Sequence, residues 1–268
     1  MFTYYTKNEN KLIKKFERDG FLIFDIKKNK KKIDQIKELT NKEILKIFNK
    51  KKFLFKKKHK SDLFNKFHLY IKSSELNQFR MAVYDGLNQQ KKFLQNYFEI
   101  AKYELETLCG NELAMQRKVN LSVQMPKDDS SLLPVHSDVW SGCSPFEVVL
   151  WVPLVNCSKT KSMYILPKNE NEKLYKKFYK YKNSGDLYSG LKNKIKWIDI
   201  KYGQGLIFTH QLMHGNLVNQ SNETRWSFNC RFKSLMSPYD KKDIAETFLP
   251  ISIRSATRFG MNYEEPKI

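Results

Sequence analysis

Long apolar runs are missing from this chain. Stretches such as Val148–Val152 are far shorter than the roughly 20 residues that a membrane-spanning helix needs. The first residues, Met1–Thr6, also lack the basic-then-apolar order of a secretory signal peptide. We therefore expect a protein that neither spans a membrane nor is secreted.

Cysteine is also scarce. The chain has only Cys109, Cys143, Cys157 and Cys230, with no C-x-x-C pair among them. This spacing argues against a zinc knuckle and against a disulfide framework. A chain of 268 residues buries a full core without such cross-links. Scattered single thiols are typical of the reducing cytoplasm, which is the location we expect.

Arginine is rare although the chain is strongly basic. The net charge of +21 arises from 42 lysines and only 7 arginines. Arginine, with its planar fork of donors, is the residue that reads base edges and phosphates bidentately. We interpret most of the charge as a solvated coat and do not expect nucleic acid as the partner. The positive field still favours anionic small molecules.

The pattern of apolar residues changes near residue 111. Before this point it is mostly helical, with apolar positions three or four residues apart. After it, short strand-like segments alternate with turn residues, and a Lys- and Tyr-rich helical insertion interrupts them. The expected helices cover 7–18, 33–47, 61–70 and 88–108, and the basic run 50–60 is interpreted as a solvated helix face. The expected strands cover 21–26, 118–124, 146–153, 163–166, 206–209 and 225–232.

Helices followed by many short strands are typical of a jelly roll decorated by helices. We predict a mainly β fold with N-terminal helices, built on a double-stranded β-helix (jelly roll, cupin-like) core. Residues 1–268 are treated as a single domain. Its parts are a mostly helical region 1–110, a core 111–235 with the insertion 169–196, and a C-terminal extension 236–268.

Candidate metal ligands begin with the tripeptide His136-Ser137-Asp138. On a strand, residues two apart point to the same face, so His136 and Asp138 can reach one ion. His214, much later in the chain, adds a second imidazole. Two histidines and one carboxylate form the facial triad of non-haem Fe(II) oxygenases, which leaves positions open for a chelating acid and dioxygen. The tripeptide alone is a weak pattern, and the distant histidine makes it informative.

The other histidines have ordinary explanations. His59 lies among lysines and is expected to be exposed, and His68 lies in a helical pattern and is expected to be structural. His210 and His214 form an H-x-x-x-H pair, but Gln211 stands where a zinc protease needs its catalytic glutamate. We favour His214 as the ligand and keep His210 as an alternative.

Arg225 follows His214 by eleven residues, within Thr224-Arg225-Trp226-Ser227. A guanidinium fork binds a carboxylate bidentately, which lysine does not do. Ser227 faces the same side of the expected strand and can add a hydroxyl hydrogen bond. Arg231 is an in-register alternative, and a surface ion pair is the ordinary alternative for Arg225. We predict that Arg225 holds an organic acid beside the metal.

Together these motifs resemble the 2-oxoglutarate/Fe(II)-dependent dioxygenases and, within them, the phytanoyl-CoA hydroxylase-like group. The resemblance rests on 16–23, 149–154, 163–167 and 214–225. It implies that His136, Asp138 and His214 bind Fe(II), and that Arg225 and Ser227 hold the distal carboxylate of 2-oxoglutarate.

The resemblance also implies polar contacts toward cosubstrate or substrate from Asn120 and Gln124, on the strand before the metal motif. Structural hydrogen bonding is an equal alternative for both. The sequence departs from the group's pattern after Pro167, where Lys168–Asn171 replaces a Gly- or Ser-His pattern. The resemblance therefore says nothing about the substrate-facing loop.

The implied chemistry is oxidation by dioxygen, with 2-oxoglutarate converted to succinate and carbon dioxide. Halogenating relatives carry a small residue in place of the ligand carboxylate. Because Asp138 is present, hydroxylation or desaturation is expected.

The substrate is the least determined part. Residues 249–266 look similar to bacterial oxygenases with carbohydrate-biosynthesis functions, and the insertion 169–196 offers tyrosines and lysines suited to sugars and phosphates. We expect a sugar or sugar-containing metabolite, with Trp140 and Arg254 as candidate contacts. Packing is the alternative for Trp140, and holding down the C-terminal segment is the alternative for Arg254 and Arg258. Other substrates left open are an amino acid or a fatty acyl thioester, and a non-catalytic nucleic-acid-binding protein is the alternative of a different class. The oligomeric state is not predicted.

Overall fold

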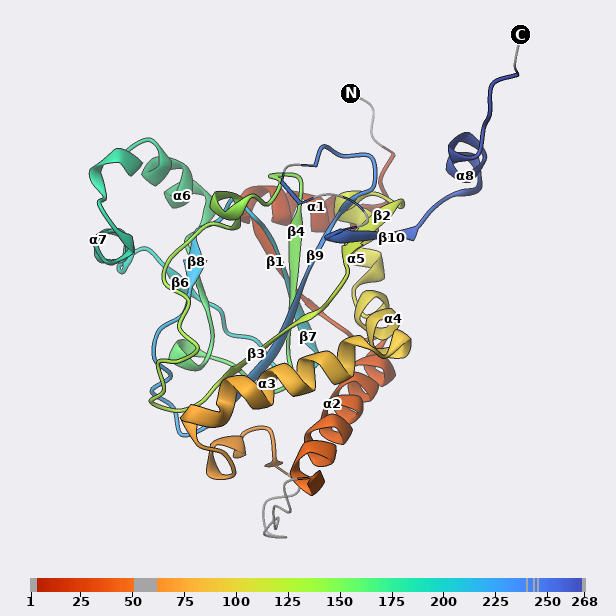
Figure 1. The fold of residues 1–268 in the computed structure, drawn as a ribbon. Helices are drawn as coiled ribbons and strands as arrows, with labels where there is room; N and C mark the ends of the chain where they lie inside the picture. Colours follow the sequence, from red (N-terminus) through yellow and green to blue (C-terminus); the bar gives the residue numbers. More distant parts are fainter. Residues whose placement is uncertain (1–3, 51–61, 240, 243, 245, 267–268) are drawn as a thin grey trace.

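The computed structural model describes residues 4–50, 62–239, 241–242, 244 and 246–266 (Figure 1). The helices are α1 (Lys7–Asp19), α2 (Lys30–Lys50), α3 (Ser73–Asn88), α4 (Lys91–Glu99), α5 (Lys102–Cys109), α6 (Lys168–Tyr175), α7 (Ser184–Leu191) and α8 (Ser255–Met261). The strands are β1 (Phe21–Asp25), β2 (Leu113–Gln116), β3 (Asn120–Gln124), β4 (Val148–Pro153), β5 (Tyr164–Ile165), β6 (Lys196–Trp197), β7 (Gln204–Thr209), β8 (His214–Gly215), β9 (Arg225–Ser234) and β10 (Phe248–Ser252).

These strands form two antiparallel sheets. The larger sheet has the order β1-β7-β4-β9-β2-β10, and β3 also pairs with β9. The smaller sheet has the order β6-β5-β8. The chain thus has a mixed α and β architecture with antiparallel sheets. The predicted mainly β fold gave too little weight to the helices, because the helices of residues 1–110 form a layer of their own.

Strand β9 lies at the centre of the larger sheet. It pairs with β4 along one side, and with β3 and then β2 along the other. Successive side chains of a strand point to opposite faces. On one face Trp226 and Phe228 pack edge-on against Phe67 and Phe93, with ring centroids 4.8 Å and 5.2 Å apart. That face is therefore covered by the N-terminal helical layer.

The N-terminal element boundaries follow local chemistry. Helix α1 begins with a capping box between Thr6 and Glu9, which satisfies backbone N–H groups at the helix start. It ends at Gly20, whose φ of 77° is left-handed and suits a residue without a Cβ. The expected helix over 7–18 and the expected strand over 21–26 are confirmed.

The expectation for residues 61–70 was wrong, and helix α3 was missed. Among the described residues of this range the chain forms turns and a 3-10 helix at Phe67–Leu69. Contacts with a distant segment fix this conformation, because the carbonyl of Asn65 accepts the N–H of Thr224 and the imidazole of His68 lies 2.9 Å from the Thr224 hydroxyl. Tertiary structure thus decided these turns. Most of the basic run 50–60 lies outside the described residues.

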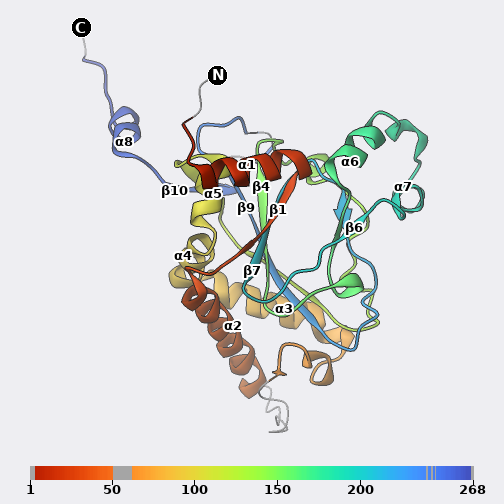
Figure 2. The ribbon, with the colours of Figure 1, turned by 180° about the vertical axis from the view of Figure 1, so that it is seen from behind.

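Helix α3 had a readable signal. Its buried residues recur at helical spacing and are Leu76, Phe79, Val83 and Leu87. The helical insertion was predicted and is confirmed as α6 and α7, whose buried leucines pack with residues of the smaller sheet. Figure 1 shows α6 and α7 (teal) projecting on the side of β6 and β8, away from α2 and α4. In the reverse view, too, α8 stands apart from the rest of the chain (Figure 2).

No helix in the described part of the chain combines the length and apolar character that crossing a bilayer requires.

Substitution of Phe67 tests how the N-terminal helical layer is held against the larger sheet. It is fully buried between Trp226 of β9 and Phe79 of α3. Phe67→Ala should lower the free energy of unfolding by about 3–5 kcal/mol, because it leaves a cavity in a close-packed core. Urea unfolding measures this. Leu69→Ala, at an exposed position of the same turn, is the control and should change stability by less than about 0.5 kcal/mol. Equal losses in both variants would contradict this account.

Candidate metal centre

His136, Asp138 and His214 meet at one point. Their ligand atoms all lie within 4.8 Å of one another. The Nε2 atoms of His136 and His214 are each 4.0 Å from a carboxylate oxygen of Asp138. The structure therefore brings together the three residues that the sequence pattern selected.

A β-bridge and a short helical turn produce this arrangement. His136 forms an isolated antiparallel bridge with His214, with backbone hydrogen bonds of 3.0 Å and 2.9 Å in the two directions. Ser137 is extended, with φ −119° and ψ 135°, so His136 and Asp138 share a face as expected from strand alternation. The strand geometry ends there, because Asp138 begins a short 3-10 helix, Asp138–Ser141.

Backbone carbonyls fix the orientation of both imidazoles. Nδ1 of His136 lies 2.8 Å from the carbonyl of Pro134, and Nδ1 of His214 lies 2.9 Å from the carbonyl of Leu212. A carbonyl only accepts, so each Nδ1 carries the proton and each Nε2 turns a lone pair toward Asp138. Such contacts orient metal-binding histidines. Burial, with a smaller effect of His136, lowers the pKa of His214 to about 4, so this imidazole is neutral at pH 7.

Asp138 is held as a carboxylate. Burial by itself would raise its pKa, but His214, His210 and Arg231 together bring the pKa below its ordinary value. Nη2 of Arg231 lies 3.2 Å from Oδ1. Two imidazole Nε2 atoms and one carboxylate oxygen match the facial triad of a ferrous ion, so the residues present fit the metal.

A cavity of about 690 Å³ opens beside this triad. Strands β3, β4, β7 and β9 of the larger sheet line it on one side, and β8 with the His136 bridge lines it on the other. Its ionisable residues are Asp138, His136, His214 and three of the chain's arginines, Arg80, Arg225 and Arg231. No lysine lines it within the described residues. The cavity is thus polar at defined points, as small-molecule sites are.

Arg225 is a buried cation without an acid partner. It is 3% exposed. It donates from Nη1 to the carbonyl of Ser162 at 3.2 Å and from Nη2 to Oγ of Ser122 at 3.1 Å, while Nε has no partner. Burial lowers its pKa to about 10, so it stays charged at pH 7. Burying such a charge is costly unless an anion pairs with it. Arg225 is therefore an uncompensated positive charge at the wall of the cavity.

Arg231, the in-register alternative, has a different position. It pairs with Asp138 and donates to Oε1 of Gln116 at 3.2 Å. Arg231 thus has a carboxylate partner, whereas Arg225 has none.

The neighbouring polar residues lie around Arg225 without all reaching the cavity. Asn120 lines it and bonds Oδ1 of Asn229. Gln124 pairs with Arg225 in register and donates to the carbonyl of Leu217, while its Oε1 has no partner. The hydroxyl of Ser227 is buried and without a partner, but Ser227 is not among the cavity-lining residues.

Sequence reasoning missed Ser122, which is the hydroxyl that actually contacts Arg225. The signal was available, because Ser122 lies between Asn120 and Gln124 and shares their face of β3. Arg80 of α3, which also lines the cavity, was missed because the helix itself was missed.

The two candidate substrate residues lie elsewhere. Trp140 is 42% exposed and its ring lies 5.0 Å from that of Phe178 in the insertion. Arg254 precedes α8, and its backbone N–H bonds Glu112 at 2.8 Å. Neither lines the cavity. Their contact with substrate stays a prediction without support from this geometry.

No family model matches this sequence, and no curated protein matches it significantly. Solved structures do match. One is the non-heme monooxygenase ThoJ in a Ni complex, with a TM-score of 0.51 and 16% identity over 91% of this chain and 84% of that one. Another is the epimerase SnoN in complex with Fe3+, alpha ketoglutarate and nogalamycin RO, with a TM-score of 0.51 and 12% identity over 87% and 86%. A third is the alpha ketoglutarate dependent carbocyclase SnoK, with a TM-score of 0.53 and 10% identity over 88% and 86%.

At these identities the likeness is one of fold. The chain has the fold of the non-haem, 2-oxoglutarate-dependent enzymes, and its H-x-D…H residues assemble there as a candidate facial triad.

Proposed function

We propose that this protein is a non-haem Fe(II)- and 2-oxoglutarate-dependent dioxygenase that hydroxylates or desaturates a small metabolite. The observation that carries the proposal is the unpaired, buried Arg225 in the same cavity as the triad. A metal site alone would fit many proteins. A metal site that shares a cavity with an uncompensated guanidinium fits an enzyme that binds a chelating organic acid.

We assign different roles to the residues of the site. His136, Asp138 and His214 would hold the ferrous ion, which with 2-oxoglutarate and dioxygen supplies an oxidant for C–H bonds. Arg225, oriented by Ser122 and the Ser162 carbonyl, would bind and align the distal carboxylate. Because Asp138 occupies the third ligand position, a halide has no vacant place there and oxidation is favoured over halogenation.

We also propose that the two sheets are the layers of a double-stranded β-helix, the jelly-roll core predicted from the sequence. The support is the position of the cavity, which the larger sheet and β8 line from opposite sides. Asn120 lines this cavity directly, and Gln124 and Ser227 would support its cosubstrate end from behind the wall.

For the substrate we propose an anionic small metabolite, with a sugar-containing precursor as the best candidate. Of the three arginines in the cavity, Arg225 is assigned to 2-oxoglutarate and Arg231 pairs with Asp138. Arg80 remains, and its guanidinium donates only to neutral oxygens, the Leu121 carbonyl and Oδ1 of Asn77. An arginine placed in this way suits a carboxylate or phosphate of the substrate.

The metal assignment is tested with Co(II) and anaerobic Fe(II) titrations. The protein should bind one equivalent, and His214→Ala should weaken binding by more than about 10-fold, because removing a first-sphere ligand costs at least as much as removing an outer-sphere partner. His68→Ala, which changes a histidine away from the cavity, is the control and should bind as the unmodified protein does. Metal binding that survives loss of His214 would contradict the triad.

The cosubstrate assignment is tested by the visible charge-transfer band of the anaerobic Fe(II)–2-oxoglutarate complex. Arg225→Ala should raise the 2-oxoglutarate concentration needed for half-saturation by about 10- to 100-fold, because a charge-assisted hydrogen bond contributes about 1.5–3 kcal/mol. Arg18→Ala, an exposed arginine paired with Asp19, is the control. If the intact protein gives no band, the proposed function fails.

The substrate class is tested by succinate release above the uncoupled background. Phosphorylated or acidic sugars should stimulate release, whereas their neutral counterparts should not. Arg80→Gln should raise the KM of a stimulating compound by about 10-fold or more while leaving half-saturation by 2-oxoglutarate unchanged. Stimulation by neutral sugars alone would rule out the anionic assignment.

A further inference from the structure

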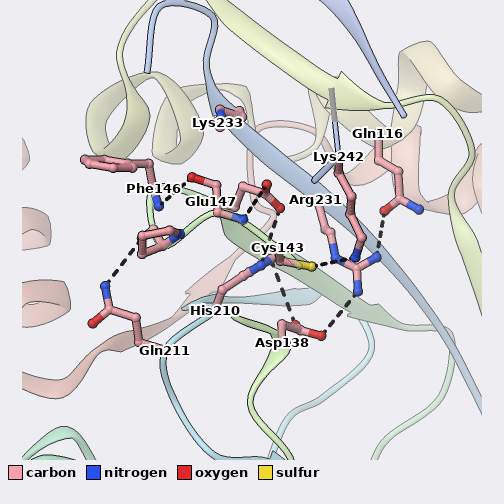
Figure 3. Close-up of polar contacts among 12 residues, drawn as sticks. Gln116, Asp138, Cys143, Phe146, Glu147, His210, Gln211, Arg231, Lys233 and Lys242 are labelled. Atoms are coloured by element: carbon pink, nitrogen blue, oxygen red, sulfur yellow. Dashed lines mark hydrogen bonds and ion pairs between the residues drawn. The ribbon is translucent and has the colours of Figure 1, made fainter. Parts of the chain in front are cut away.

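Behind the ligand carboxylate lies a chain of buried polar groups that runs from Glu147 through His210 to Asp138 (Figure 3). Nδ1 of His210 is 3.4 Å from Oε2 of Glu147, and its Nε2 is 3.9 Å from Oδ2 of Asp138. The side chains of His210 and Glu147 are both fully buried. His210 was the alternative metal ligand from the sequence, and the structure places it directly behind a ligand.

Several of these buried atoms lack a hydrogen bond of good geometry. They are Oε2 of Glu147 and both ring nitrogens of His210. Unsatisfied polar atoms are costly in a dry interior. Glu147 is fixed at its other oxygen by the backbone N–H of Ser144 at 3.0 Å, and Oγ of Ser137 donates to the His210 carbonyl at 2.8 Å. Glu147 and His210 are therefore each anchored by a neighbouring serine, and His210 lies between two carboxyl groups.

The proton positions in this chain are constrained. A neutral histidine has one N–H and one lone pair. If that N–H faced a Glu147 carboxylate, the Nε2 lone pair would face the Asp138 carboxylate, which is repulsive. Burial lowers the pKa of His210 to about 3, which disfavours an imidazolium. The remaining arrangement is a protonated Glu147 that faces Nδ1, with Nε2–H pointing at Asp138.

A second metal ion is the other explanation for this cluster. The ligand atoms of Cys143, Glu147 and His210 lie within 4.8 Å of one another. However, Nζ of Lys242 lies 2.8 Å from the Cys143 sulfur, and Lys233, Arg231 and Lys242 all act on the Glu147 carboxyl. So many cations oppose a further divalent ion next to the triad, and they favour a chain of polar side chains that holds no ion.

We propose that Glu147 and His210 are positioning residues, which hold the Asp138 carboxylate in its metal-binding orientation by an Nε2–H directed at Oδ2. Arg231 holds Oδ1 from the other side at 3.2 Å. With one donor facing each oxygen, rotation of the carboxylate about its Cβ–Cγ bond is restricted. The carboxylate then presents the same lone pair to the ion. The inference rests on the metal role of Asp138 proposed above. Outer-sphere partners of this kind tune metal affinity by about 10- to 100-fold.

The test compares Co(II) affinity and the position of the Fe(II)–2-oxoglutarate charge-transfer band in four variants. His210→Phe and Glu147→Leu should each weaken Co(II) binding by about 10-fold or more and shift the band maximum. Glu147→Gln should behave as the unmodified protein, because its amide N–H still donates to Nδ1 and keeps Nε2–H toward Asp138. Cys143→Ala is the matched control, since this buried residue belongs to the same cluster without contacting Asp138.

The double variant Glu147→Leu with His210→Phe should be no worse than His210→Phe alone, because both residues act on Asp138 through the same imidazole. Near-UV circular dichroism confirms that each variant is folded. If one variant is not folded, the Co(II) affinities of the others still test the inference. Either the comparison of Glu147→Gln with Glu147→Leu or the affinity of His210→Phe alone is then used. Unchanged Co(II) affinity and an unchanged band in the folded variants overturn the inference. A second equivalent of Co(II) that Cys143→Ala abolishes also overturns it, in favour of a metal site.

The proposed function fails separately, by the absence of metal binding and of a band in the unmodified protein.

Discussion

The two-faced character of strand β9 is the constraint on which the rest of the structure depends. Its aromatic residues Trp226 and Phe228 lie against the N-terminal helical layer, whereas Arg225, Asn229 and Arg231 line the metal cavity. A shift in register by one residue would exchange these faces. Burial of the aromatic rings therefore fixes where the guanidinium groups point. In this way the packing energy of the helical layer sets the geometry of the site.

The cavity contains few charged side chains, although the whole chain is strongly basic. Most of the described lysines are exposed or half-buried, and none of them lines the cavity. The cavity instead holds arginines with fixed neighbours: Arg231 on Asp138, Arg225 on Ser122, and Arg80 on Asn77. Arginine keeps its charge when buried and presents its donors in one plane. The selection of arginine over lysine supports recognition of carboxylates or phosphates at defined positions, beyond a general attraction to anions.

The metal ligands depend on both local and distant contacts. Backbone carbonyls of Pro134 and Leu212, each two residues before its histidine, set the ring orientation locally. The bridge between His136 and His214 brings together residues far apart in the chain. Asp138 forms an ion pair with Arg231 of β9 and faces His210. Each ligand is thus positioned by a different element, and the larger and smaller sheets have to pack correctly for the site to form.

Much of this could be predicted from the sequence because the relevant signals are local. The capping residues of α1, the left-handed Gly20, the alternation in β9 and the H-x-D motif are readable without a structure. The turns at 62–70 could not be read, since Asn65 and His68 take their conformation from contacts with Thr224. The alternation assumed for His136 and Asp138 holds across the extended Ser137, whereas the 3-10 helix that begins at Asp138 was not expected.

The sequence by itself determined the donor set, since residue type and order decide that two imidazoles, one carboxylate and one guanidinium are available. Only the tertiary structure decided how they are used. It paired Arg231 with Asp138, left Arg225 buried without an acid, and placed His210 behind the ligand carboxylate. The physical reason is that pairing and burial depend on distances between segments separated by many residues. No local pattern encodes which of two in-register arginines a distant aspartate will reach.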